Sequence, residues 1–203
     1  MNLTITKTRI TKMALAAMIF AITLLAFTLP LSAHAEPVAD DETQAIVTFE
    51  AGSLTIGSAP ILNFGTNNIS SAVDTIEATT VSEPVQVSDL RGSGEGWNLN
   101  VSLSPFIHSD GTTETLQGAS IQIDKSTVSG ANETVGNTPT VPADLEITAD
   151  NTETPVFIAE TGHGMGVWEI EWEATDVDLI VYPGTAHIGT NTATLTWSLQ
   201  TAP

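Results

Sequence analysis

Two copies of one aromatic triplet are the residues of this chain best suited to binding chemistry. The pattern Trp-x-Leu occurs twice, 100 residues apart. In an extended chain, residues i and i+2 point to the same face, so each Trp stands beside its Leu. Indole rings stack on the C–H faces of sugars and dominate many interfaces. The candidate binding residues are therefore Trp97, Asn98, Leu99, Trp197, Ser198 and Leu199.

The same pattern also fits a structural role. Polar residues alternate with the apolar residues of both triplets and already supply a solvent-facing side. This alternation favours an inward, core position for both triplets, with direct ligand contact as the alternative. Trp168 and Trp172 also share one face of a predicted strand, and core packing is favoured for them too.

Few other residues are arranged for catalysis or metal binding. His108, His163 and His187 are not at metal-ligand spacing, and the chain has no Gly-x-Ser-x-Gly motif and no cysteine. Among 24 acidic residues, a pair suited to glycoside hydrolysis is expected by chance. Asp176 and Asp178 offer oxygens for calcium, but no EF-hand loop supports such a site. The sequence predicts no enzyme, no metal site and no cofactor.

The N-terminus has the pattern of a secretory signal peptide. Three basic residues precede an apolar run, Met13 to Leu31, and Ala33-His34-Ala35 fits the site of a signal peptidase. We predict cleavage after Ala35, which gives a signal peptide of residues 1–35 and one domain of residues 36–203. The alternative is an uncleaved anchor, because the apolar run nearly spans a bilayer. Pro30 and the Ala-x-Ala site favour cleavage, after which we expect no membrane span.

The composition of the mature chain limits its partners and its means of attachment. Cleavage would leave 168 residues, with Arg91 and Lys125 as the basic residues against 24 acidic ones, a formal charge of −22. Such a charge repels nucleic acid and anionic lipid at long range, and it also repels anionic wall polymers unless bound cations intervene. Without cysteine, no disulfide forms and no lipid is attached through a thiol. We therefore expect non-covalent attachment at any surface.

Strict alternation predicts strands over 96–104, 167–174 and 193–199. In the second of these, Glu169, Glu171 and Glu173 form the predicted solvent face. The apolar set then changes parity and continues at Val177, which predicts a bulge or tight turn near 174–176. Weaker strand signals lie at 45–50, 53–56, 61–64, 74–78, 84–90, 120–124, 144–148 and 155–160.

The predicted fold is all-β: a single antiparallel β-sandwich or barrel-like domain with long loops and little or no helix. Its longest expected loop covers residues 126–142, which are poor in apolar residues and rich in Ser, Thr, Gly, Asn and Pro.

Several segments resemble the WxL-domain family of surface proteins from low-GC Gram-positive bacteria. Residues 47–56 are similar to the opening strand of that family, and 90–101 to its first motif with the glycine-rich approach. Residues 116–121, 166–168 and 181–203 are similar to later segments. One departure is Asn191, where members commonly carry Tyr before the Thr-Ala-Thr-Leu run.

The resemblance implies a secreted protein that is held non-covalently at the surface of a Gram-positive cell. It implies binding to peptidoglycan, and assembly with other WxL proteins and membrane-anchored WxL-interacting proteins. It also implies a link to adhesion to host extracellular matrix in some members. Two readings of the function stay open: direct attachment to the wall, or a protein-interaction module that reaches the wall through partners.

Overall fold

The computed structural model describes residues 41–130, 136–143 and 145–202. The chain divides into two units, Met1–Val47 and Thr48–Pro203. In the first unit, the described residues 41–47 are exposed and belong to no strand or helix. The predicted signal peptide and its cleavage site lie outside the described residues and stay predictions.

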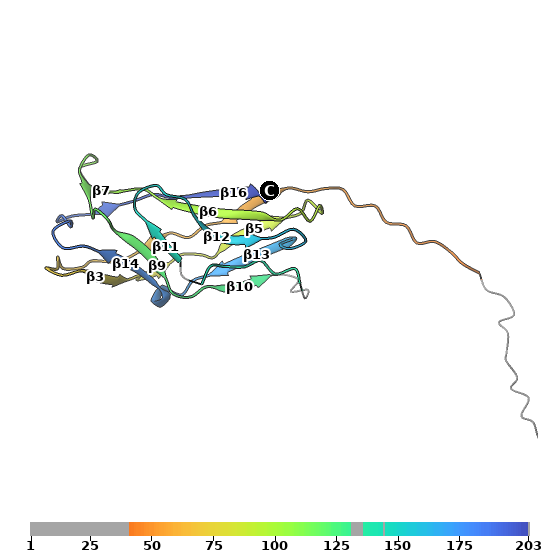
Figure 1. The fold of residues 1–203 in the computed structure, drawn as a ribbon, viewed down its shortest axis with the longest axis horizontal. Coiled ribbons are helices and arrows are strands. Elements are labelled where there is room, and N and C mark those ends of the chain that lie inside the picture. Colours follow the sequence, from red (N-terminus) through yellow and green to blue (C-terminus); the bar gives the residue numbers. More distant parts are fainter. Residues whose placement is uncertain (1–40, 131–135, 144, 203) are drawn as a thin grey trace, which may run out of the picture. The chain divides into compact units, whose positions relative to one another are not determined.

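The regular secondary structure of the second unit is almost entirely short antiparallel strands, joined by turns and loops (Figure 1). The strands are β1 (Leu54–Ser58), β2 (Leu62–Asn63), β3 (Asp74–Glu77), β4 (Thr80–Val81), β5 (Val85–Asp89), β6 (Trp97–Leu103), β7 (Phe106–His108), β8 (Glu114–Thr115), β9 (Ser120–Ile123), β10 (Thr127–Gly130), β11 (Leu145–Thr148), β12 (Thr154–Ala159), β13 (Gly166–Glu171), β14 (Val177–Val181), β15 (Asn191–Thr192) and β16 (Leu195–Thr201). A single 3₁₀ turn, η1 (Ala174–Asp176), is the helical element of the described residues.

These strands form several open sheets. The orders are β1-β5-β13-β10, β11-β9-β14-β3, β12-β6-β16, β15-β7-β8 and β2-β4, and every pairing is antiparallel. Each sheet has two edge strands, so no barrel closes among the described residues. Strands β6, β12 and β16 run along one side of the unit, and β10 and β13 along the other (Figure 1). The all-β prediction is confirmed.

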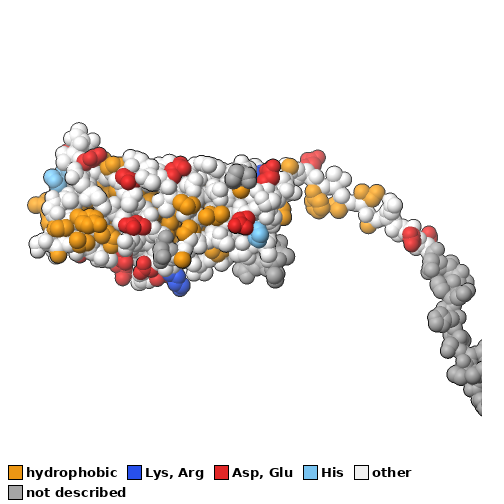
Figure 2. Space-filling view, in the orientation of Figure 1, with side chains coloured by type: hydrophobic (Ala, Val, Ile, Leu, Met, Phe, Trp, Pro, Cys, Tyr) orange, Lys and Arg blue, Asp and Glu red, His pale blue; other side chains and the backbone are white. Residues whose placement is uncertain are grey.

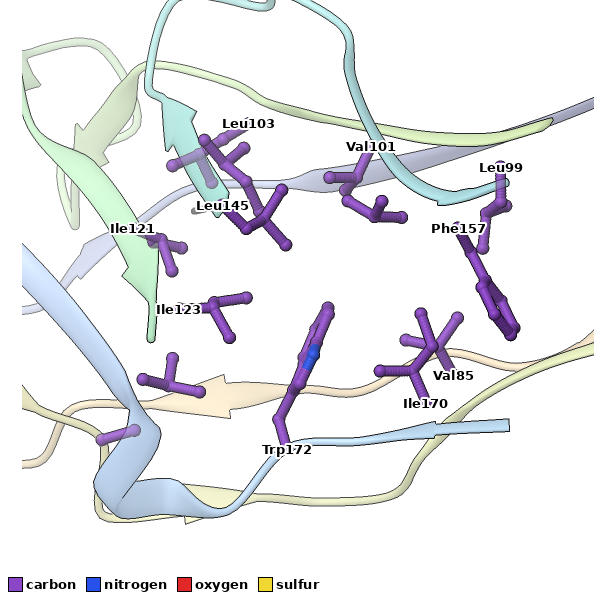
Figure 3. Packing of buried hydrophobic residues seen from close by; sticks show 14 of the residues in the cluster. Val85, Leu99, Val101, Leu103, Ile121, Ile123, Leu145, Phe157, Ile170 and Trp172 are labelled. Atoms are coloured by element: carbon purple, nitrogen blue, oxygen red, sulfur yellow. The ribbon is translucent and has the colours of Figure 1, made fainter. Parts of the chain in front are cut away.

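One apolar core joins these sheets. Leu99 and Phe157 face Val85 and Ile170 across the core, and Trp172 stands beside them (Figure 3). The alternation of β6 is complete, because all four of its odd-numbered residues are at most 1% exposed. Trp168 and Trp172 are also buried, as the alternation of 167–174 predicts.

The change of parity after Trp172 is produced by η1. This 3₁₀ turn separates β13 from β14, so the inward set passes from Trp168, Ile170 and Trp172 to Val177, Leu179 and Val181. A tight turn near 174–176 was the expectation, and it is confirmed.

Two local predictions are wrong. Residues 45–50 form no strand: all are exposed, and no neighbouring strand is present to bond them. Residues 126–142 are not one loop, because β10 lies within them and pairs with β13. Its Gly130 packs under the ring of Trp168, where an added Cβ would lie 2.5 Å from the ring. The glycine that suggested a loop is therefore a packing requirement.

Candidate functional site

The fold places the two Trp-x-Leu triplets on neighbouring strands. β6 and β16 pair antiparallel along seven residues each, and Leu99 lies directly opposite Leu199. Because the strands are antiparallel, the two Trp residues are displaced in opposite directions: Trp97 lies opposite Thr201, and Trp197 opposite Val101. Segments 100 residues apart in sequence thus form one continuous surface.

The apolar residues of the first triplet belong to the core. Trp97 and Leu99 have no exposed surface. The indole Nε1–H of Trp97 donates to the Gly164 carbonyl at 3.0 Å, and its ring meets Phe157 edge-to-face at 4.9 Å between centroids. Since a buried indole N–H needs an acceptor, this bond fixes the β12–β13 connection against the start of β6.

The apolar residues of the second triplet are only half-buried. Trp197 and Leu199 face the same inward side as Trp97 and Leu99, but β16 is an edge strand and leaves part of them open. The Trp197 ring stacks on Trp172 with centroids 6.2 Å apart and planes 28° apart. The Trp172 indole N–H in turn donates to the Ser126 hydroxyl at 2.8 Å.

The outer side of these strands is polar and uncharged. We name it the amide face; its residues are Asn98, Asn100, Ser102, Thr196, Ser198 and Gln200. Among the described residues, the only side-chain hydrogen bond made by this set runs from the Gln200 amide to the Ser198 hydroxyl, at 3.3 Å. Both middle residues of the triplets, Asn98 and Ser198, lie on it. Its amides and hydroxyls are free to bond a ligand.

Two apolar side chains border the amide face. On β12, Pro155 lies opposite Asn100 and Ile158 lies opposite Asn98. Pro155 is exposed and Ile158 is half-buried. An apolar ledge beside amide groups is an arrangement that suits a sugar ring, which has C–H faces and a polar rim.

A buried ion pair holds the glycine-rich approach to β6. Arg91 bonds both carboxylate oxygens of Asp89 at 2.9 Å, and its Nη2 also donates to the Gly96 carbonyl at 2.9 Å. Asp89 is 2% exposed. The hydrogen bonds from Arg91 keep the pKa of Asp89 below its ordinary value, and they raise the pKa of Arg91. One of the two basic residues that follow the predicted cleavage site is thus used to position the first triplet.

An apolar cleft of about 1080 Å³ lies at the other end of β6 and β16. Hydrophobic side chains gather at the end of the unit where β3 and β14 lie (Figure 2). Ile61, Ile69, Tyr182 and Ile188 border the cleft and are 46–88% exposed. Among the described residues, the carboxylate and imidazole groups that line it are those of Asp74 and His187.

Sites for metal ions are absent from the described part of the chain. No group of three or more His, Cys, Asp and Glu side chains could hold an ion there. The fold does bring His108 and His187 together, with ring centroids 6.3 Å apart, which their sequence positions do not indicate. Within the same residues, no helix has the length and apolar character needed to cross a membrane.

Comparison with known families tests the resemblance that the sequence motifs indicate. The model of the WxL domain, described as a surface cell-wall-binding domain, matches residues 27–203. The chain belongs to the WxL family. It has no significant match among curated proteins or among solved structures. This WxL protein is therefore a cell-surface protein with a wall-binding domain, as the resemblance of its motifs implies.

The sequence indicated part of this WxL surface and missed the rest. The alternation of β6 separates a buried face from the polar residues Asn98, Asn100 and Ser102. The half of the amide face that lies on β6 can therefore be predicted from the sequence. The pairing of β6 with β16, which completes the amide face, has no local sequence signal. The ion pair of Arg91 with Asp89 was also missed, although two oppositely charged residues at a strand end are its signal.

Proposed function

We propose that this WxL domain is a non-catalytic module that binds peptidoglycan through the amide face. The observation that carries the proposal is the uncharged character of the amide face in a chain whose mature form carries −22. Amide and hydroxyl groups match the hydroxyl and acetamido groups of wall glycans, and they do so without ionic attraction. Trp97 and Leu99 then serve binding indirectly, by fixing β6 from inside.

Co-sedimentation with purified peptidoglycan tests this proposal. We expect the secreted protein to pellet with peptidoglycan. The double variant Asn98→Ala with Asn100→Ala loses two hydrogen bonds of about 1 kcal/mol each, so binding should weaken roughly tenfold to thirtyfold. The matched control is Thr127→Ala with Ser129→Ala, which removes two exposed polar groups from β10 in a different sheet. Equal binding by both variants would refute the role of the amide face.

A separate assay tests the non-catalytic character. Incubation of the protein with a suspension of cell walls should leave the turbidity unchanged, because no nucleophile motif or metal cluster is present in the described residues. Clearing of the suspension would overturn this part of the proposal.

The second candidate function is retention at the wall through protein partners. The half-exposed apolar residues of the edge strand β16 favour it, because such residues commonly anchor a partner. The partners we propose are other WxL proteins and membrane-anchored WxL-interacting proteins, with host extracellular matrix as a further ligand. Retention on cells that lack these partners supports direct wall binding, and retention only in their presence supports the second candidate.

A further inference from the structure

Strand β16 leaves one row of backbone groups unpaired. At the two ends of its pairing with β6, the Ser104 N–H donates to the Thr194 carbonyl at 2.9 Å, and the Ala202 N–H to the Gly96 carbonyl at 3.3 Å. In an antiparallel pair, bonded and non-bonded positions alternate, so the even-numbered residues of β16 bond to β6. The N–H and C=O groups directed to the free edge therefore belong to Leu195, Trp197, Leu199 and Thr201.

Three other edge strands of the fold carry features that hinder strand addition. On β12, the opposite edge of the same sheet, Pro155 lies next to a bulge, and Ile158 is bridged by Thr140. β1 has a bulge between Ile56 and Ser58, and β3 carries two acidic residues. Pro, bulges and charges are the usual devices that prevent strand addition. β16 has none of these among its seven residues, and the half-open Trp197 and Leu199 lie along it.

The same chain contains an unpaired segment with the properties of a strand. In an extended chain over residues 45–51, one side consists of the apolar residues Ala45, Val47, Phe49 and Ala51. The other side consists of Ile46, Thr48 and Glu50. In the structure Val47 is 73% exposed and Phe49 is 87% exposed. Large hydrophobic side chains in such a row are costly to leave in water and call for a covering surface.

We propose that the free edge of β16 accepts residues 45–51 of a second copy of this chain as an added antiparallel strand. The two segments have the same length, seven residues, and the single charge between them is Glu50. Charge repulsion between two acidic chains is therefore weakest here. Added beside β16, the donor segment places Val47 and Phe49 inward, where they cover Trp197 and Leu199. Glu50 then faces solvent on the outer side.

The donor side is tested by two variants of the secreted protein. Val47→Lys with Phe49→Lys puts charges on the side that would face inward, and Thr48→Lys puts one on the opposite side. Light scattering after size exclusion should show a dimer or a larger species for the parent and for Thr48→Lys. The double variant should associate at least tenfold more weakly. Because these residues are exposed, circular dichroism should show the same fold for all three proteins.

The acceptor side is tested by Thr201→Pro, which removes an N–H directed to the free edge and none that bonds β6. This variant should also be monomeric. Mixing it with the Val47→Lys, Phe49→Lys double variant should restore a one-to-one complex, because one chain keeps its donor segment and the other keeps its free edge. If the parent instead associates through apolar segments that stick to one another, mixing these two variants would not restore a complex.

Three results would overturn the proposal. The first is a parent protein that stays monomeric at about 100 μM, well above the micromolar range of a weak specific complex. The second is association that the Val47→Lys, Phe49→Lys double variant retains. The third is a monomer in which residues 45–51 are protected from hydrogen exchange by their own chain. If Thr201→Pro fails to fold, the donor variants still decide. Pelleting with peptidoglycan, measured for each variant, keeps this outcome separate from that of the proposed wall binding.

Discussion

At the scale of single residues, Trp97 acts by packing and by one hydrogen bond. Its indole N–H reaches the Gly164 carbonyl, and a Cβ added to Gly164 would lie 2.6 Å from the indole nitrogen and 2.4 Å from Ala159 Cβ. Both approaches are closer than atoms allow, so glycine is required there for steric reasons as well as for its positive φ of 76°.

Gly164→Ala should therefore destabilise the domain far more than Gly162→Ala. Both positions have positive φ, 76° and 86°, but an added Cβ at Gly162 meets no atom within 4 Å. Gly162→Ala should cost about 1 kcal/mol from backbone strain alone, and Gly164→Ala about 3 kcal/mol or more because Trp97 must also move. Urea unfolding followed by tryptophan fluorescence measures both free energies. Equal costs would mean that the contact with Trp97 contributes nothing.

The ion pair of Asp89 with Arg91 predicts a loss of stability in acid. The hydrogen bonds from Arg91 lower the pKa of Asp89 in the folded state below the ordinary value of 3.8. The charged form is thus favoured by folding, and this contribution is fully present above that ordinary value. It is lost as the pH falls through the lower, folded pKa. Unfolding free energies measured from pH 6 to pH 2 should decrease through this window.

The variant Arg91→Met identifies the source of this loss. It leaves the Asp89 carboxylate buried without its partner, which should cost about 3 kcal/mol at neutral pH. Protonation of Asp89 then relieves the cost, so the stability of Arg91→Met should fall less steeply in acid than that of the parent. Parallel pH profiles for the two proteins would contradict a role for this pair.

At the scale of elements, η1 controls which residues of β14 reach the core. Its three residues change the parity between β13 and β14, and none of them is buried. Deleting Thr175 would shorten this connection by one residue and would turn the side chains of β14 over, placing Asp178 where Val177 now packs. We expect this deletion to prevent folding, whereas Thr175→Ser, at an exposed position, should leave the melting temperature within about 1 °C. Secretion yield and circular dichroism measure the outcome.

At this scale, the sequence alone predicts some strands and misses others. Alternation predicted β6, β13, β14 and β16, because apolar and polar residues alternate along a strand that buries one face. It failed for residues 45–50, where the pattern is present but no partner strand bonds it. It failed in the opposite sense for β10, where a polar composition hides a strand that its neighbour β13 holds in place. Pairing between distant strands, which builds the amide face, leaves no local pattern.

At the scale of the whole molecule, the acidic residues lie apart from the proposed binding surface. The chain carries 24 acidic residues, yet the amide face and the strand β16 contain none of them. Acidic side chains are scattered elsewhere over the surface, and Figure 2 shows them separated on the visible face. Long-range repulsion from anionic polymers therefore opposes approach to a wall without weakening the contacts made at the amide face.

This separation predicts different responses to salt for two preparations of wall. With purified peptidoglycan, stripped of anionic polymers, pelleting should change by less than about twofold between low salt and about 0.5 M salt, because uncharged contacts are not screened. With walls that retain anionic polymers, pelleting should increase over the same range, since salt screens the repulsion of the −22 chain. Binding to purified peptidoglycan that disappears at about 0.15 M salt would place ionic contacts at the centre of recognition, and the amide face could not then be the binding surface.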